Sequence, residues 1–453
     1  MLTLILAAGQ GKRMHSQRPK VLQPLAGKPL IYHLLDRLAH WPGRLALVYG
    51  HGGDLLKAEL APRYPELQWI EQAEALGTGH AVAQALPFIQ PEETVLVLYG
   101  DTTQIARRTL EALLARAEQN DLTLLSAWLA NPHGYGRILR NASGQIQAIV
   151  EERDATPEQR LIQEIHTGVL AARGAVLHKL LPRLNNHNPA GEFYLTDLVA
   201  LAGAEGLRVE ALPLEDSDEM QGVNDRRQLA ALEAFLRRRA AEALLDQGVT
   251  LVDPTRIDVQ GPLTVGRDVY LEPNIMFKGQ NVLGDGVRIE SNCVLENCHI
   301  GAGTVILSHS RLEGVQVGAD CHIGPFARLR PQTILADGVK VGNFVELKAS
   351  EIKSGTKINH LSYIGDSNVG VGVNIGAGTI TCNYDGANKF KTVIGDNVFI
   401  GSNSALVAPL NIGSDATVGA GSVIRKDVKN QSLVLTVGER REKENWPRPV
   451  KKK

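Results

Sequence analysis

The first half of the chain alternates short apolar runs with amphipathic stretches. The apolar runs have the length of buried strands, and they are residues 2–9, 45–50, 94–100 and 122–129. Stretches between them, such as residues 29–41 and 108–119, repeat their apolar positions at helical spacing. This alternation predicts an α/β fold in which residues 1–226 form a Rossmann-like domain. Helices would cover both faces of a parallel sheet, and ligands would bind beyond the carboxyl ends of its strands.

A longer amphipathic stretch follows, and it predicts one exposed linker helix over residues 227–247. Arginines occupy one face, and Gly248 ends the pattern. The apolar positions at helical spacing are Leu229, Leu232, Leu236 and Ala243.

From residue 265 the period of the apolar positions becomes six. Two uninterrupted series are Val265, Leu271, Phe277, Leu283, Ile289 and Leu295, and Ile394, Ile400, Leu406, Ile412, Val418 and Ile424. Hexapeptide repeats are typical of a parallel β-helix, in which three six-residue sides make a coil of about 18 residues with the aliphatic side chains inside. Known hexapeptide coils are left-handed, so we expect a left-handed β-helix over residues 248–453. Residues 381–392 break the repeat and predict a loop that leaves the coil, a usual place for function.

Composition narrows the functional classes. The 453 residues carry 48 basic and 49 acidic side chains, so no overall charge recruits nucleic acid or an anionic membrane. No apolar stretch approaches the ~20 residues that span a bilayer, and the N-terminal run lacks a signal peptide's basic residues. We therefore expect a cytoplasmic protein. The cysteines lack C-x-x-C spacing, which favours reduced, buried thiols over zinc or a disulfide; they are Cys293, Cys298, Cys321 and Cys382.

Positive charge is concentrated just after the first predicted strand, where Lys12, Arg13, Arg18 and Lys20 follow Gly9. A strand, a glycine-rich turn and a helix start would present backbone N–H groups and a helix dipole to one point. Arg13 and Lys20 could pair with phosphate oxygens there. The pattern predicts a nucleoside triphosphate site, although not a P-loop, because G-x-x-x-x-G-K-[ST] is absent. A solvated cationic loop is the alternative.

Motifs along nearly the whole chain carry a family resemblance. They are LAAGxGxRMxSxxPK, EQAEALGTGHA, VLYGD, GYGRI, IVEERDAT and GVNDRRQL in the first half, and FARLRP, GNFVELK, NHLSYIGD and NIGAGTITCNYDGANKFKT in the second. Together they resemble the family of bacterial bifunctional N-acetylglucosamine-1-phosphate uridyltransferases and glucosamine-1-phosphate N-acetyltransferases. The resemblance implies a uridyltransferase (pyrophosphorylase) domain at 1–226, a linker helix at 227–247 and an acetyltransferase β-helix at 248–453.

The same resemblance implies a reaction sequence. Acetyl-CoA would acetylate glucosamine 1-phosphate, and the product would react with UTP to give UDP-N-acetylglucosamine, which feeds peptidoglycan and lipopolysaccharide synthesis, and pyrophosphate. It also implies a homotrimer whose acetyl-transfer site is shared between subunits.

The resemblance further assigns roles in the first half. Uridine would contact Ala7, Ala8, Gly9, Gln72, Gly77 and Thr78. Arg13 and Lys20 would hold the triphosphate, and Asp101 with Asn224 would bind one or two Mg²⁺ ions. N-acetylglucosamine would be read by Gly136, Glu151 and Asn224, and the substrate site would also include Leu6, Tyr99, Gly100 and His166.

Three positions depart from the family pattern. His166 stands where the family usually has a sugar-contacting Asn, and a neutral imidazole can still hydrogen-bond. The segment after Asp101 reads GDTTQI instead of the usual G-D-x-P-L, and Lys12 replaces a common Thr beside Arg13.

In the second half the resemblance places the general base of acetyl transfer on His360, with Glu346 as its helper. The sugar phosphate would be bound by Arg330, Lys348, Tyr363, Asn374 and Lys389. The acetyl-CoA site would be lined by Ala377, Asn383, Tyr384, Ser402 and Ala420. A family arginine near the C-terminus falls on Val437, and Arg440 or Arg441 could substitute for it.

Two alternatives remain at the level of sequence. The β-helix could be only an oligomerisation and regulatory scaffold for a nucleotidyltransferase, but a scaffold has no need for His360 and the polar 381–392 loop. It could also be a zinc-dependent hydratase, but the histidines lack paired spacing; they are His299, His309, His322 and His360.

Overall fold

The computed structural model describes residues 1–9, 11–436 and 442, and its internal contacts divide the chain into two units. The units are Met1–Ala234 and Phe235–Lys453, and the division falls within helix α8 (Arg226–Asp246). The boundaries expected at 226/227 and 247/248 stay predictions. Among the helices that the structure describes, none is long and apolar enough to cross a membrane.

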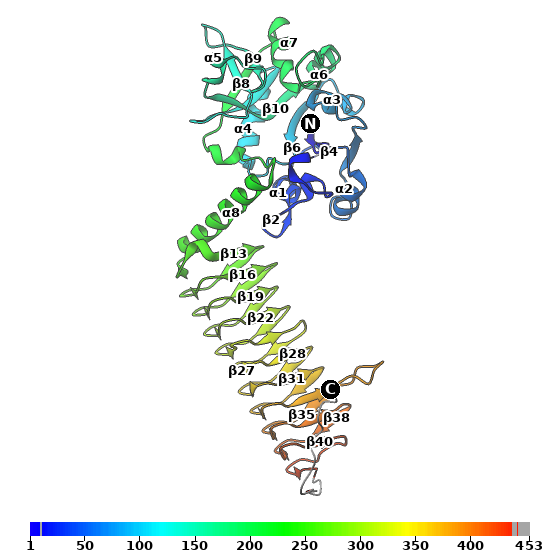
Figure 1. Cartoon of the computed structure of the whole chain (residues 1–453), viewed down its shortest axis with the longest axis vertical. Coiled ribbons are helices and arrows are strands. Elements are labelled where there is room, and N and C mark those ends of the chain that lie inside the picture. Colours follow the sequence, from blue (N-terminus) through cyan, green and yellow to red (C-terminus); the bar gives the residue numbers. More distant parts are fainter. Residues whose placement is uncertain (10, 437–441, 443–453) are drawn as a thin grey trace, which may run out of the picture. The chain divides into compact units, whose positions relative to one another are not determined.

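The first unit is built on one mixed sheet with the order β11-β7-β10-β6-β1-β4-β5, to which the β8–β9 hairpin is attached (Figure 1). Its strands are β1 (Leu2–Leu6), β4 (Arg44–Tyr49), β5 (Gln68–Glu71), β6 (Thr94–Tyr99), β7 (Leu122–Trp128), β8 (Arg137–Arg140), β9 (Ile146–Val150), β10 (Glu164–Arg173) and β11 (Val209–Pro213). A separate small ribbon joins β2 (Pro24–Leu25) to β3 (Lys28–Pro29). All four predicted strands are present, as β1, β4, β6 and β7.

The expected parallel sheet is wrong at β10 and at the attached β8–β9 hairpin, whose strands pair antiparallel. β1 runs parallel to β4 and β6, but β10 runs antiparallel to both β6 and β7. Strand direction depends on how the chain returns between strands. The apolar runs themselves carry no such information.

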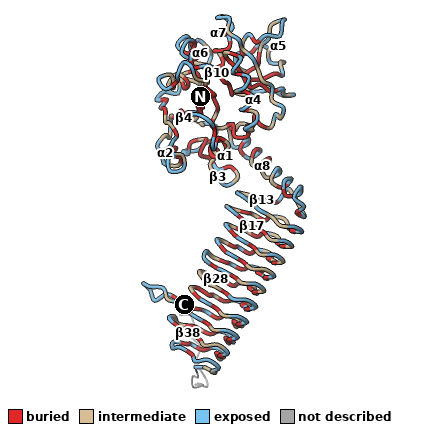
Figure 2. The backbone as a smooth tube through the Cα atoms, turned by 180° about the vertical axis from the view of Figure 1, so that it is seen from behind, coloured by how far each residue is buried: buried red, intermediate tan, exposed pale blue. Residues whose placement is uncertain are grey.

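Apolar residues fill both faces of this sheet, as the α/β prediction requires. Leu2, Leu4 and Leu6 of β1 belong to one buried cluster, while Ile5 belongs to another on the opposite face. The helices that supply the remaining apolar surface are α1 (Leu30–Arg37), α2 (Gly53–Leu60), α3 (Thr78–Ala83), α4 (Arg107–Ala117), α6 (Gly174–Leu180) and α7 (Leu198–Ala204). The short helix α5 (Pro157–Arg160) has no buried residue. The buried backbone of the strands is visible in Figure 2.

Helix α8 follows the predicted linker helix, but its buried residues differ from those expected. Leu229 and Leu232 are buried, whereas Leu236 is half-buried and Ala243 is exposed. The other buried positions of the helix are Phe235, Ala241 and Leu244. Ala241 and Leu244 join the apolar core of the second unit, so the end of the helix is part of that unit's core and is not simply an exposed linker.

The second unit is a parallel β-helix of three strand stacks, in agreement with the predicted left-handed hexapeptide fold (Figure 1). The first stack runs from β12 (Thr250–Leu251) through β27 (Lys340–Asn343), β30 (Lys357–His360), β33 (Asn374–Ile375), β36 (Phe399–Ile400) and β39 (Thr417–Val418) to β41 (Leu433–Val434). The second runs from β13 (Ile257–Gln260) through β25 (Arg328–Leu329), β28 (Glu346–Lys348), β31 (Tyr363–Gly365) and β34 (Ile380–Cys382) to β40 (Val423–Ile424). The third runs from β14 (Leu263–Val265) through β35 (Thr392–Ile394) to β38 (Leu410–Ile412).

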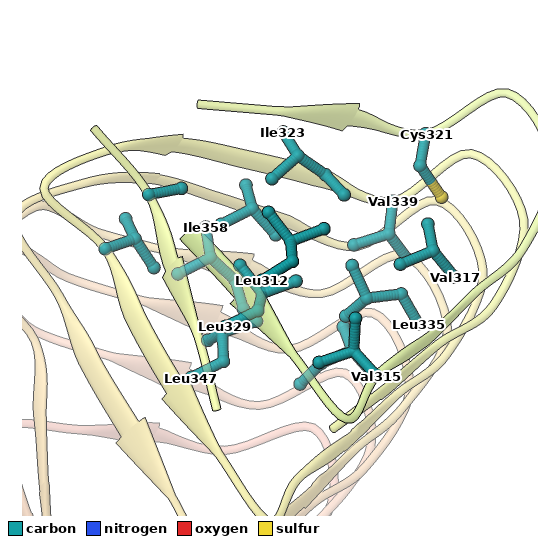
Figure 3. Packing of buried hydrophobic residues seen from close by; sticks show 14 of the residues in the cluster. Leu312, Val315, Val317, Cys321, Ile323, Leu329, Leu335, Val339, Leu347 and Ile358 are labelled. Atoms are coloured by element: carbon teal, nitrogen blue, oxygen red, sulfur yellow. The ribbon is translucent and has the colours of Figure 1, made fainter. Parts of the chain in front are cut away.

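One aliphatic side chain from each side of a coil points into the solenoid. In the second stack, Leu312, Leu329 and Leu347 lie in register on successive coils. Figure 3 shows this column beside residues of the other two stacks, including Ile323 and Val317. All residues of the two predicted six-residue series are buried except Val265, which is partly buried against the same core.

The four cysteines are free thiols in the described residues, and the expected burial holds for three of them but not for Cys382, which is partly exposed. Cys293, Cys298 and Cys321 are buried in the solenoid core, and burial raises the pKa of Cys293 and Cys298 to about 11. Within the part of the chain that the structure describes, no group of three or more His, Cys, Asp or Glu side chains could hold a metal ion.

The predicted loop leaves the coil between β34 and β35 (Figure 1). Ile358, Ile375 and Ile400 lie in register on three successive coils. The chain between Ile375 and Ile400 is longer than the chain between Ile358 and Ile375, because it contains this loop. The extra residues form a short excursion closed by a bridge between Tyr384 and Lys389.

Candidate functional site

A cleft of about 540 Å³ opens in the first unit where β1 and β6 end. Most of the predicted nucleotide residues line it: Leu6, Ala7, Ala8, Gly9, Arg13, Lys20, Gln72, Gly77, Thr78, Tyr99, Asp101 and Asn224. The lining also includes Lys12, which the sequence had marked as an extra charge, and residues that sequence reasoning missed: Gly11, Val21, Ala75, Ala81 and Glu192.

Gly100 lies behind the cleft instead of lining it. Its N–H donates to Leu6 O at 2.9 Å, which joins the ends of the two central strands. A Cβ atom at Gly100 would lie 3.1 Å from Val21 Cγ1, so the glycine lets the loop after β6 pack closely. Gly100 therefore shapes the cleft wall.

The loop after β1 differs from the expected helix start. The helical segment that the structure describes there is a 3₁₀ turn, Lys12–Met14, which is too short to carry an appreciable dipole. Arg226 fixes this turn, because its guanidinium donates to Met14 O at 3.1 Å and to Gln23 Oε1 at 2.9 Å. The positive potential of the cleft therefore comes from Lys12, Arg13 and Lys20 rather than from a helix.

The two predicted metal ligands lie together across the cleft. Thr102 and Gly222 form an antiparallel bridge, which brings the segment carrying Asn224 beside Asp101. Lys20 Nζ contacts Asp101 Oδ2 and lies 3.3 Å from Asn224 Oδ1. One cationic group therefore reaches both oxygens. A carboxylate with an amide oxygen is the kind of partial oxygen set that Mg²⁺ completes with water and phosphate.

The opposite wall of the cleft presents the side-chain amide of Gln72 and a glycine with positive φ, Gly77. The backbone N–H of Gln72 donates to Tyr49 O at 2.7 Å, and its side-chain Nε2 donates to Gly77 O at 3.0 Å. Gly77 has φ 106° and ψ 175°, a conformation that essentially only glycine adopts. Thr78 then begins α3 and its hydroxyl accepts from Leu195 N–H at 3.1 Å.

The predicted sugar residues Gly136, Glu151 and His166 form a second group beside the cleft. Gly136 O accepts from His166 N–H at 2.9 Å, and a Cβ atom at Gly136 would lie 3.5 Å from each Glu151 carboxylate oxygen. Burial raises the pKa of Glu151, whose Oε1 accepts from the Thr196 hydroxyl at 3.0 Å. The structure thus joins the His166 backbone to Gly136 and places the Glu151 carboxylate beside the same glycine.

Tyr99 connects this group with the metal ligands. Burial is the main reason that its pKa is raised, and the carboxylates of Glu151 and Asp101 add to the effect. The ring therefore lies close to both groups. His166 is 6% exposed. Burial lowers the pKa of its imidazole to about 4, against a smaller opposite effect of a hydrogen bond with the Leu125 backbone.

In the second unit, five residues fall on one line at the corner that follows the first strand stack. We call them the corner column, and they are Asn343, His360, Ala377, Ser402 and Ala420. Each lies two residues after an inward aliphatic residue of the first stack, one coil from the next, so their spacing is about 4.8 Å. Backbone contacts continue along this corner, with Asn403 N–H donating to Ala377 O at 2.7 Å and Gly421 N–H donating to Ser402 O at 2.8 Å.

His360 has a different partner from the one expected. Its Nδ1 lies 3.0 Å from Asn343 Oδ1, whereas Glu346 pairs with Arg330 at 3.0 Å and with Arg328 at 3.7 Å. Within one chain, Glu346 is therefore not the helper of His360. Sequence reasoning missed Asn343, although it precedes His360 by one coil, and that spacing was the signal that could have found it.

A charged cluster occupies the outer face of the second stack. Lys348 Nζ lies 3.0 and 3.1 Å from the two Asp366 carboxylate oxygens, and Asn383 Nδ2 donates to the same carboxylate. Asn383 also lies 3.4 Å from the Tyr363 hydroxyl. Asp366, which the sequence analysis did not select, therefore ties Lys348 to the base of the excluded loop.

Lys389 reaches the same cluster from the loop. The neighbouring Lys348 ammonium lowers the pKa of Lys389, so the two cations are close enough to repel each other. Arg330 adds a third positive charge nearby. Such a group of cations is suited to an anionic ligand.

The remaining predicted residues are more dispersed. Asn374 lies on β33, in register with Lys357 and Phe399. Tyr384 is 60% exposed in the loop. Val437, Arg440 and Arg441 lie outside the described residues.

Family models match three parts of the chain. Residues 3–177 match the MobA-like NTP transferase domain, residues 259–345 match the GMPPB C-terminal domain, and residues 391–426 match six repeats of the bacterial transferase hexapeptide.

A curated relative and a solved structure extend this comparison. The chain is 52% identical over 450 residues to the "Bifunctional protein GlmU" of Cellvibrio japonicus, covering 99% of each chain. It is 18% identical to the crystal structure of a putative glucose-1-phosphate thymidylyltransferase from Bacillus anthracis in complex with a sucrose. That match covers 52% of this chain and 96% of the other, and its TM-score of 0.43 is too low to support an argument.

Proposed function

The chain belongs to the family of the bifunctional protein GlmU, and from this membership we propose how its two units share two successive reactions. The enzyme makes UDP-N-acetylglucosamine. It transfers an acetyl group from acetyl-CoA to glucosamine 1-phosphate, and then a uridylyl group from UTP to N-acetylglucosamine 1-phosphate, with release of pyrophosphate. The observation that carries this conclusion is the 52% identity over 99% of both chains.

Uridylyl transfer is assigned to the cleft of the first unit. The sugar phosphate oxygen attacks the α-phosphorus of UTP, the bond to the β-phosphate oxygen breaks, and pyrophosphate leaves. Arg13 and Lys20 would neutralise the triphosphate, and Gln72 would hydrogen-bond the uracil. No protein nucleophile is required, because binding, orientation and charge neutralisation supply the catalysis.

The metal expected for this step is Mg²⁺, which Asp101 and Asn224 would hold. It would supply additional positive charge for the phosphates. The Lys20 ammonium that contacts both oxygens in the chain alone would then be released to pair with phosphate. The oxygen-only donor pair supports Mg²⁺ over a softer metal.

The sugar is assigned to the polar spot around Gly136, Glu151 and His166. Because Gly136 has no side chain, a hydroxyl group of the sugar could approach the Glu151 carboxylate, which accepts hydrogen bonds. His166 would meet the sugar as a neutral imidazole, since burial keeps its pKa near 4.

Acetyl transfer is assigned to the corner column and the charged cluster. Asn343 Oδ1 would accept from Nδ1–H of His360, which leaves the lone pair on Nε2 free to take a proton. The amine of glucosamine 1-phosphate attacks the thioester carbon, its proton goes to His360, the C–S bond breaks and CoA leaves as a thiol after protonation. Lys348, Lys389 and Arg330 would hold the sugar phosphate, and Asn383, Tyr384 and the smaller column residues would line the acetyl-CoA site.

We also propose a cytoplasmic homotrimer, since hexapeptide transferases are suited to side-by-side association of solenoids. Single-chain exposure of His360 and Tyr384 supports a site completed by a neighbouring subunit. Equilibrium sedimentation should give three times the chain mass of 49.0 kDa. A monomer with full acetyltransferase activity would contradict this assignment.

The test of the whole proposal uses purified protein with glucosamine 1-phosphate, acetyl-CoA, UTP and Mg²⁺. UDP-N-acetylglucosamine should form only in the complete mixture. When acetyl-CoA is omitted, added N-acetylglucosamine 1-phosphate should restore the formation of UDP-N-acetylglucosamine. If that restoration fails while pyrophosphate is still released from UTP, the sugar assignment is wrong.

A further inference from the structure

Arg137, at the start of β8, carries a guanidinium group that is almost completely buried. Its side chain is among the largest fully buried ones in the protein, with 1% exposure. One terminal nitrogen donates to Glu152 Oε2 at 2.6 Å, and the other donates to Tyr135 O. A further contact of 3.5 Å reaches Arg160 O.

Glu152 gathers several partners in addition to Arg137. Its carboxylate accepts from Gly134 N–H at 3.3 Å, lies 3.3 Å from His133 Nδ1 and lies 4.0 Å from Arg160 Nε. Hydrogen bonding to Arg137 is the main reason that the pKa of Glu152 is lowered. The carboxylate therefore stays charged and ties residues 133–137 to the end of β9.

The two members of this pair stand next to the predicted sugar residues. Gly136 precedes Arg137, and Glu151 precedes Glu152, while Arg137 and Val150 are in antiparallel register. The Arg137–Glu152 contact therefore joins the two chain segments immediately beside Gly136 and Glu151, and it can fix the separation of these two neighbours. Tyr135, whose carbonyl accepts from Arg137, lies near enough to Asp101 for that carboxylate to help raise its pKa, after the larger effect of burial.

Stability alone does not explain a buried ion pair at this position. Desolvation offsets most of the attraction within such pairs, and apolar replacements are often equally stable. Here the desolvation penalty of the pair is greater, because Arg137 Nε is buried and has no hydrogen-bond partner among the described residues. What the pair does supply is a fixed geometry for the β8–β9 edge of the sugar site.

We propose that Arg137 and Glu152 are positioning residues, which hold Gly136 and Glu151 at the separation that the sugar of N-acetylglucosamine 1-phosphate requires. The proposal rests on the uridylyl transfer assigned above. It concerns the sugar phosphate alone, because the contacts described for the pair reach none of the residues that line the nucleotide cleft. Loss of the pair should therefore weaken the binding of N-acetylglucosamine 1-phosphate and leave the binding of UTP unchanged.

The experiment measures initial rates of uridylyl transfer while each substrate is varied in turn. Glu152→Gln keeps the shape of the side chain but removes its charge, and it should raise KM for N-acetylglucosamine 1-phosphate roughly tenfold or more. KM for UTP should stay within about twofold of the wild-type value, since misplacement is confined to the sugar edge. Arg137→Lys keeps the charge but loses the planar group that donates to Glu152 and to Tyr135 O at the same time, and it should give a smaller rise in the same constant.

Arg140→Gln is the matched control. Arg140 lies on the same strand and also pairs with a carboxylate, donating to Glu164 at 2.7 and 2.8 Å, but at the end of β8 away from Gly136. This variant should leave both KM values unchanged. An unchanged KM for UTP also shows that the first unit of each variant is folded.

Two results would overturn the proposal. One is a Glu152→Gln enzyme with wild-type KM for both substrates. The other is a loss of selectivity, either as an equal rise of both KM values in Glu152→Gln or as the same rise of the sugar-phosphate KM in the Arg140→Gln control. Failure of the wild-type enzyme to use N-acetylglucosamine 1-phosphate at all would instead refute the proposed function. Because the Glu152 carboxylate is 21% exposed, Glu152→Gln should fold even if substitutions of buried Arg137 do not.

Discussion

Replacing Gly77 by alanine should destabilise the first unit and weaken UTP binding together. Gly77 has φ 106° and ψ 175°, where a side chain costs roughly 1–3 kcal/mol. The new Cβ atom would also lie 2.6 Å from Phe193 O and 2.9 Å from Phe193 N, closer than real Cβ atoms approach. Phe193 cannot move freely, because its N–H donates to Leu76 O at 2.8 Å and its O accepts from Gly79 N–H at 2.8 Å.

The magnitude follows from adding the overlap to the strain. Overpacking of this kind costs typically ~1–3 kcal/mol, so the total is about 2–6 kcal/mol. With a urea slope of roughly 2–3 kcal/mol per molar, the unfolding midpoint should fall by ~1–3 M. Tryptophan fluorescence can follow the transition, because Trp41, Trp69 and Trp128 all lie in Met1–Ala234.

A matched glycine separates strain from overlap. Gly206 has φ 68°, but a Cβ atom there would meet no atom of the described residues within 4 Å, so Gly206→Ala should cost only about 1 kcal/mol. KM for UTP should rise several-fold in Gly77→Ala, because Gln72 Nε2 donates to Gly77 O, and it should not change in Gly206→Ala. Equal midpoint shifts in the two variants would refute the reasoning from Phe193.

Three further predictions address the separate sites. His360→Ala should lower acetyl transfer by roughly 10²–10⁴-fold without changing uridylyl transfer from N-acetylglucosamine 1-phosphate, and Asn343→Ala should produce a smaller fall in acetyl transfer alone. Asp101→Asn should raise the Mg²⁺ concentration needed for half-maximal uridylyl transfer, measured by metal titration, while acetyl transfer on the same preparation stays normal. Burial lowers the pKa of His166 from 6.5 to about 4, so between these pH values the unfolded chain binds a proton that the folded chain does not, and stability falls as the pH falls. Between pH 6.5 and pH 4, the free energy of unfolding measured in urea should therefore fall by about 3 kcal/mol less in His166→Asn than in the wild type.

The sequence was sufficient for features encoded by short-range periodicity. The six-residue spacing of aliphatic residues predicted the solenoid, since each inward position is decided by its own coil, and the buried core confirms it. The apolar runs likewise predicted β1, β4, β6 and β7. The direction of β10 was not predictable in this way, because it depends on the path of the chain between strands.

Contacts between distant segments were also beyond the local pattern. Lys20 contacts Asp101 and Asn224, which lie 81 and 204 positions further along the chain, and the spacing of these residues does not predict either contact. The pairing of Asn343 with His360 was hidden for another reason. One coil of spacing points to Asn343, but the coil length is not constant along the solenoid, with 18 residues at one coil and 17 at another, and the helper at Glu346 came from the family resemblance.

The corner column has a consequence for how the solenoid can change in length. Every complete turn brings the backbone back to the same azimuth, so gain or loss of a whole turn outside Asn343–Ala420 would leave the column intact. An insertion of a single hexapeptide between His360 and Ser402 would rotate everything that follows by a third of a revolution and move Ser402 to a different corner from His360. Insertions and deletions in this region should therefore be tolerated only when they add or remove complete coils.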